Sequence, residues 1–192
     1  MRRIIKVTWA IAGVMSLILL TSSIGSAQKL AKSFVIQAQA MGQSTQLGQT
    51  FGITLIIEEY STEADKSALL EAFNSKGNEG LVNALNKMHT KGRMSITGTL
   101  GYDVAYIRQW PQPDGTTKIR LVTNRPIRFG EAWSDSRSMD YSLSGVDIVL
   151  SPNKKQNSGT LVPACKLKMN KENQLELEIL QNPWKLVNIM KR

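Results

Sequence analysis

The chain has 192 residues, with 24 Lys and Arg against 15 Asp and Glu and a formal net charge of +9 at pH 7. Its only cysteine, Cys165, excludes an intramolecular disulfide, so a hydrophobic core must stabilise the fold. A single domain near this length buries about 70% of the surface that its unfolded chain exposes, which is enough for such a core.

Residues 1–27 have the three parts of a secretory signal peptide. "MRRIIK" is a short cationic start, "VTWAIAGVMSLILL" is an apolar stretch, and "TSSIGSA" is a segment of small residues. Gly25 and Ala27 stand at the −3 and −1 positions of a predicted cleavage site before Gln28. The alternative is an uncleaved membrane anchor, but the apolar stretch is shorter than the about 20 residues that cross a bilayer. We therefore predict an exported protein, periplasmic or extracellular, without a transmembrane segment in the mature chain.

The mature chain is basic and leaves the compartment that contains nucleic acid. Loss of Arg2, Arg3 and Lys6 lowers the Lys and Arg count from 24 to 21 and the net charge from +9 to +6. Export removes DNA and RNA as expected partners and leaves an anionic envelope component as one candidate. The charge is spread along the chain without a run, which more often serves solubility alone.

The first half of the mature chain predicts strands followed by two helices. Residues 33–40 alternate, residues 41–50 form a polar loop, and residues 51–60 are a β-branched strand. Thr62 and Asp65 form a capping box before a helix that Gly77 ends, and a second helix ends at Gly92. The short connection between the two helices predicts a helical hairpin.

From Arg93 onward the apolar residues recur with the period of two that strands have. Gly98 and Gly101 interrupt residues 93–110, and "PQPDG" is a turn before the returning strand 116–125. Gly145 marks a possible bulge. Further strands are predicted in residues 138–151, 159–170, 174–180 and 184–190. The predicted fold is a single α+β domain over residues 28–192, in which six to nine strands form an antiparallel meander that curls into a partly open barrel or a sandwich.

Three segments carry a resemblance to a known group of proteins. They are residues 61–88, with "STEADKSALLEAFNSKGNEGLVNALNKM", residues 101–127, with "GYDVAYIRQWPQPDGTTKIRLVTNRPI", and residues 137–150, with "RSMDYSLSGVDIVL". The sequence resembles an uncharacterised family of small secreted bacterial proteins with no assigned activity. The resemblance implies a shared fold over most of the mature chain, and it implies no substrate or catalytic residue.

One predicted hairpin gathers basic and aromatic side chains on one face. If Ile107 and Leu121 face the core, then Tyr106, Arg108, Trp110 and Arg120 lie together on the outside. Stacking of Arg on the aromatic rings explains this composition structurally, and that interpretation is favoured. The functional interpretation is that these four residues bind an anionic or sugar-bearing partner.

The sequence offers few residues for catalysis. His89, the only histidine, stands at a predicted helix end, and Cys165 lies in an apolar strand without a nearby base. Glu131, Asp135 and Asp140 lie close to Trp133 and Tyr141, as the carboxylates of a glycosidase lie beside aromatic residues, but pairing with neighbouring arginines is favoured. No P-loop, GxGxxG, HExxH or CxxC motif is present, so no catalytic residue, metal or cofactor is predicted.

Three functions remain as hypotheses. The first is a non-enzymatic exported protein that binds an envelope component or a protein partner through its sheet surface. The second is a carrier of a small apolar ligand, with a cavity inside the curled sheet. The third is a hydrolase that uses Glu131, Asp135 and Asp140.

Overall fold

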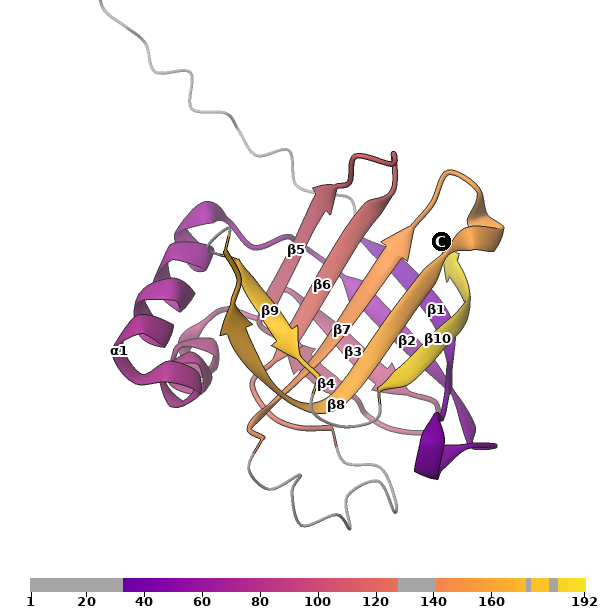
Figure 1. Ribbon diagram of the computed structural model, residues 1–192, viewed down its shortest axis with the longest axis horizontal. Helices are drawn as coiled ribbons and strands as arrows, with labels where there is room; N and C mark the ends of the chain where they lie inside the picture. The colour runs from indigo at the N-terminus through magenta and orange to yellow at the C-terminus, as the bar shows by residue number, and fades with distance from the viewer. Residues whose placement is uncertain (1–32, 128–140, 172–173, 180–182) are drawn as a thin grey trace, which may run out of the picture.

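The structure, a computed structural model, describes residues 33–127, 141–171, 174–179 and 183–192. The predicted signal peptide and the carboxylates Glu131, Asp135 and Asp140 lie outside the described residues. The fold is α+β and is dominated by one antiparallel sheet with a single long helix beside it (Figure 1). This architecture confirms the predicted fold class.

The sheet contains ten strands, one more than the upper end of the expected number. The difference arises between Gly92 and Pro111, where the chain is divided into three short strands. In chain order the strands are β1 (Phe34–Met41), β2 (Thr50–Ile57), β3 (Gly92–Ile96), β4 (Tyr102–Val104), β5 (Tyr106–Pro111), β6 (Thr117–Thr123), β7 (Leu143–Leu150), β8 (Ser158–Met169), β9 (Leu175–Glu178) and β10 (Trp184–Lys191).

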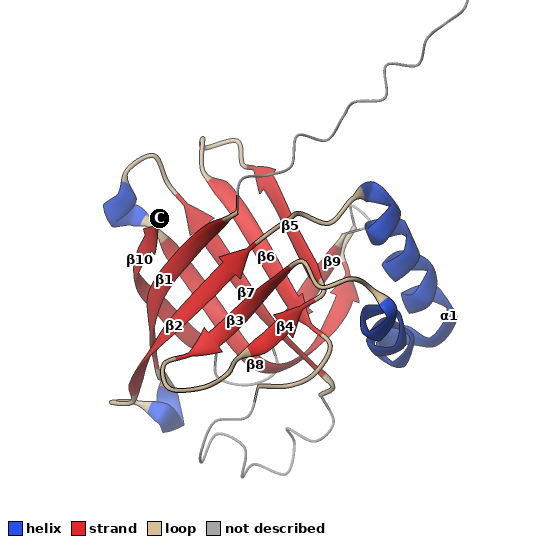
Figure 2. Ribbon diagram, turned by 180° about the vertical axis from the view of Figure 1, so that it is seen from behind, coloured by secondary structure: helices blue, strands red, loops and turns tan. Residues whose placement is uncertain are grey.

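The order of the strands makes the sheet a nearly closed barrel. The order is β4-β3-β2-β1-β10-β8-β7-β6-β5, with β9 attached to β8. The two ends of this series, β4 and β5, follow one another in the chain with only Ala105 between them. They therefore act as two halves of one bent strand, of which the first half pairs with β3 and the second half with β6 (Figure 2). The barrel prediction is thus favoured over a sandwich.

Local turn chemistry follows the sequence closely. Asp114 accepts hydrogen bonds from the backbone and hydroxyl of Thr116, and Gly115 has a φ of +80°, which suits the turn between β5 and β6. The register of β7 on β8 shifts between Leu143 and Gly145, which confirms the bulge predicted at that glycine.

Large apolar side chains fill the inside of the barrel. Trp184 is fully buried there, and its ring lies 4.6 Å from the ring of Phe51 on β2. Ile107 and Leu121, on β5 and β6, belong to the same core, as the alternation in their strands predicts. The interior is therefore occupied by side chains that come from both halves of the sheet.

Helix α1 (Glu63–Lys87) replaces the predicted hairpin of two helices, which is not confirmed. The predicted capping box of Thr62 and Asp65 is present at its start. Lys76 and Gly77 have non-helical backbone angles, with a φ of +57° at Gly77, so α1 consists of two helical segments that meet at a kink. Among the described residues, no helix is both long enough and apolar enough to cross a membrane.

A second core joins α1 to the outside of the barrel. Leu69, Leu81 and Leu85 of α1 are buried against Val122 of β6 and Leu177 of β9, together with neighbouring apolar side chains. Both views place α1 and β9 on the same side of the barrel (Figures 1 and 2). As a result, part of the outer face of the sheet is covered.

Candidate functional site

The hairpin of β5 and β6 places the predicted basic and aromatic residues on one face. Tyr106 lies opposite Val122, Arg108 opposite Arg120, and Trp110 opposite Lys118. Their inward neighbours Ile107 and Leu121 are buried in the barrel. The four predicted residues therefore share the outer face, as their alternation requires.

Two of these four side chains are much less exposed than the sequence predicts. Tyr106 is 6% exposed and Arg120 is 4% exposed, because α1 and β9 pack over this part of the outer face. Arg108 keeps a side-chain exposure of 21%. The prediction of an open basic and aromatic surface is corrected to a partly covered pocket.

Arg120 is bound to other groups through all three nitrogens of its guanidinium. Its Nε and Nη2 donate to the two carboxylate oxygens of Asp147, each at 2.6 Å, and its Nη1 donates to the carbonyl oxygen of Leu175 at 2.5 Å. Oδ2 of Asp147 also forms an ion pair with the ammonium nitrogen of Lys118, 3.1 Å away. This bidentate pair fixes the Arg120 side chain, so Arg120 forms a wall of the pocket rather than a free donor.

Arg108 is bound much less completely than Arg120, its cross-strand neighbour. Its Nη2 donates to Oε1 of Glu63 at 2.6 Å, whereas Nη1 is buried without a hydrogen-bond partner among the described residues. Like charges directly opposite one another repel, and here each arginine turns to a carboxylate of its own. Arg108 therefore keeps unused capacity to bind an anion.

A pocket of about 100 Å³ lies between these two arginines, α1 and the start of β9. An apolar cavity of about 150 Å³ is enough to hold benzene, so this partly open pocket suits one small group. All four residues predicted from the sequence line it. The complete lining is Lys66, Tyr106, Arg108, Trp110, Arg120, Gln174 and Leu175.

Trp110 and Tyr106 form the aromatic walls of the pocket. The ring centre of Trp110 lies 5.5 Å from the guanidinium carbon of Arg120 and 5.8 Å from the ammonium of Lys118, which are cation–π distances. Burial raises the pKa of Tyr106 to about 12, so its hydroxyl stays protonated and available as a donor. The pocket thus combines neutral and cationic donors with an aromatic surface.

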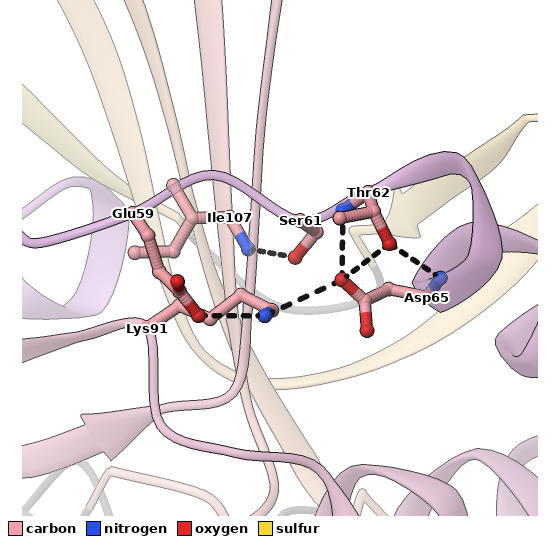
Figure 3. Close-up of polar contacts among 6 residues, drawn as sticks. All are labelled: Glu59, Ser61, Thr62, Asp65, Lys91 and Ile107. Atoms are coloured by element: carbon pink, nitrogen blue, oxygen red, sulfur yellow. Dashed lines mark hydrogen bonds and ion pairs between the residues drawn. The ribbon is translucent and has the colours of Figure 1, made fainter. Parts of the chain in front are cut away.

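A polar network at the start of α1 sets the position of Glu63 and Lys66. The buried ammonium of Lys91 lies 2.9 Å from Glu59 and 3.3 Å from Asp65, and Asp65 accepts the backbone N–H of Thr62 (Figure 3). Beside it, Ser61 donates its N–H to the carbonyl of Ile107 and accepts the N–H of Ile107 through its hydroxyl. These bonds connect the helix start to β5, the strand that carries Arg108.

This network makes an acid-sensitive contribution to stability. Burial raises the pKa of Asp65, but the hydrogen bonds of Thr62 and the charge of Lys91 outweigh it, and the net pKa lies below the ordinary value. The contribution of the Asp65 carboxylate to the free energy of unfolding is therefore complete above about pH 4, the ordinary aspartate pKa. It disappears as the pH falls through the lowered pKa of the folded protein. Denaturant unfolding at a series of pH values should show wild type and Asp65→Asn far apart in free energy near neutral pH and converging in acid. A constant difference throughout would contradict this assignment.

Several pocket residues were missed at the level of sequence. Lys66 lies on α1, for which the sequence predicts only a structural role, Gln174 directly precedes β9, and Leu175 is the first residue of β9. The one available signal was Asp147, a charged residue inside the otherwise apolar strand "VDIVL". It pointed to a buried cation as partner, and that cation is Arg120.

The other chemical candidates lie apart from the pocket or outside the described residues. Cys165 is buried, which raises its thiol pKa to about 12 and leaves it unreactive as a nucleophile. His89 is exposed after the end of α1. The described part of the chain contains no group of three or more His, Cys, Asp or Glu residues that could hold a metal ion.

Comparisons with protein families, curated proteins and solved structures give no match for this chain. The resemblance to small secreted bacterial proteins therefore stays a prediction, and the functional argument depends on the geometry of the pocket.

Proposed function

We propose that this chain is an exported, non-enzymatic binding protein that recognises an anionic group of an envelope component or a protein partner. The recognition site is the pocket between α1, β9 and the outer face of β5 and β6. The observation that carries the proposal is the largely buried guanidinium of Arg108 at the wall of a pocket, whose Nη1 is buried without a hydrogen-bond partner among the described residues.

The surroundings of Arg108 support an anion rather than a neutral ligand. Lys66 and Arg108 both line the pocket, and among the described residues Glu63 is the one carboxylate that pairs with them, at 3.8 Å and 2.6 Å. The two positive charges of Lys66 and Arg108 are therefore balanced by one negative charge, which leaves one positive charge in excess. A partly desolvated cation of this kind binds an anion more strongly than a cation on the open surface does.

The other two hypotheses have less support. The inside of the barrel is filled by residues such as Trp184 and Leu55, which gives no observation in favour of an apolar-ligand carrier. The hydrolase hypothesis depends on Glu131, Asp135 and Asp140, which lie outside the described residues. Export depends on the predicted signal peptide in residues 1–27.

Replacing Arg108 with Gln should weaken anion binding by about tenfold or more, because a hydrogen bond to a charged group contributes about 1.5–3 kcal/mol. The measurement is an NMR titration with benzoate and phenyl phosphate, using the indole N–H of Trp110 as the probe. The chain has four tryptophans, so this resonance is assigned with Trp110→Phe. The melting temperature should stay within a few degrees.

Arg93→Gln is the matched control, because Arg93 is a strand arginine of β3 that pairs with Asp103 away from the pocket. It should leave the titration unchanged. Equal binding by wild type and Arg108→Gln, or no binding by wild type, would show that the pocket is not an anion site.

A further inference from the structure

Arg108 and Glu63 are unequally buried, and the difference indicates how the pocket is used. The Arg108 side chain is 21% exposed, whereas the Glu63 side chain is 74% exposed and is not part of the pocket lining. Glu63 is the first residue of α1 and reaches Arg108 across 45 positions of the sequence. The guanidinium thus has an internal carboxylate partner that approaches from the solvent side.

The Glu63 contact is easily exchanged for another carboxylate. Arg108 holds the pKa of Glu63 below its ordinary value through a hydrogen bond and its charge, so Glu63 is ionised at neutral pH. Because Glu63 is exposed, water solvates its carboxylate well when the contact opens, and exposed ion pairs contribute little to stability. A competing anion loses little by displacing it.

The buried Nη1 atom of Arg108 would gain a hydrogen bond if the guanidinium rotated toward a ligand. In the present orientation Nη2 donates to Glu63, and Nη1 is buried without a hydrogen-bond partner among the described residues. An arginine binds a carboxylate best through two parallel N–H groups. Once Glu63 leaves, rotation of the guanidinium toward the pocket allows both Nη atoms to meet one planar carboxylate.

We infer that the ligand of this pocket carries a carboxylate on a ring, and that this carboxylate takes the place of Glu63 on Arg108. The inference rests on the proposed function. The single excess positive charge matches one negative charge, the pocket of about 100 Å³ admits one small group, and Trp110 supplies a surface for a ring. The Tyr106 hydroxyl and the Lys66 ammonium are further donors at the walls.

Glu63 is then a built-in competitor of the ligand, and its removal is the test. Glu63→Gln should bind benzoate about two- to fivefold more tightly than wild type, since the exchange no longer breaks an exposed ion pair. The readout is the same Trp110 indole titration, with benzamide as the neutral isostere and phenyl phosphate as the alternative anion. Glu71→Gln is the matched control, because Glu71 is an exposed residue of α1 outside the pocket lining and its replacement changes the net charge equally.

The outcomes separate this inference from the proposed function. Equal benzoate affinity in wild type and Glu63→Gln, or an equal gain in Glu71→Gln, overturns the competitor role while the loss in Arg108→Gln still supports an anion site. Benzamide binding as tightly as benzoate, or phenyl phosphate binding more tightly, overturns the carboxylate assignment. If Arg108→Gln binds every probe as wild type does, the proposed function itself fails.

The same chemistry occurs in a free aromatic acid and in a uronic acid unit of a polysaccharide. Titration with glucuronate beside benzoate distinguishes the two sources. Tighter binding of glucuronate assigns the ligand to an acidic saccharide, and tighter binding of benzoate assigns it to a small aromatic acid, both in agreement with the inference.

Discussion

Replacing Asp147 with Asn should lower the free energy of unfolding by about 3–5 kcal/mol, the usual cost of removing one partner of a buried ion pair. Arg120 has a side-chain exposure of 5%, and Asp147 accepts two of its N–H groups at 2.6 Å. Asn supplies one acceptor oxygen and no charge, so the guanidinium stays buried without compensation. Equilibrium unfolding in urea, followed by far-UV circular dichroism, measures the loss.

The matched control is Asp103→Asn at the exposed pair with Arg93, whose side chains are 63% and 45% exposed. There the expected loss is at most about 1 kcal/mol. If the two variants lose similar stability, Arg120 is better solvated than its burial indicates.

Truncation of Trp184 to Ala should lower the free energy of unfolding by about 3–5 kcal/mol, since it leaves a cavity inside a nearly closed barrel that cannot easily collapse. Trp184 is 1% exposed and packs on Phe51 of β2, with ring centres 4.6 Å apart. The measurement is again urea unfolding, with near-UV circular dichroism to detect a loss of fixed aromatic packing.

Met190→Ala tests whether this cost depends on burial rather than on strand β10 as such. Met190 lies on the same strand and is 51% exposed, so its truncation should change stability by about 0.5 kcal/mol or less. A small effect of Trp184→Ala would mean that the interior of the barrel repacks freely. Neither substitution should alter the Arg108 dependence of anion binding.

The sequence predicted the parts of the site that depend on neighbouring residues. Alternation in "YIRQW" and the turn ending in Gly115 fixed which side chains of β5 and β6 share a face, because period and turn type are local properties. The same holds for the capping box of Thr62 and Asp65. Strand order was not predictable, since nothing local indicates that β1 pairs with β10.

The sequence did not predict what covers this face. Tyr106 and Arg120 are buried because α1 and β9 pack over them, and those contacts join segments far apart in the chain. Glu63 pairs with Arg108 across 45 positions, a separation that no periodic pattern records. The helical hairpin is not confirmed: Lys76 and Gly77 leave the helical conformation, as a break at Gly77 predicts, but the helical segments on either side are joined by a kink without a separate connecting loop.

The pairing of β10 with both β1 and β8 has a consequence for how the chain matures. Until Trp184–Lys191 is available, the sheet consists of two separate stacks, β1 to β4 and β5 to β9, joined through the bend at Ala105. Each stack then presents an unpaired edge, on β1 or on β8, and such edges recruit other chains into aggregates. Strand β10 therefore protects both edges, so the sheet is completed only once this strand has paired with both stacks.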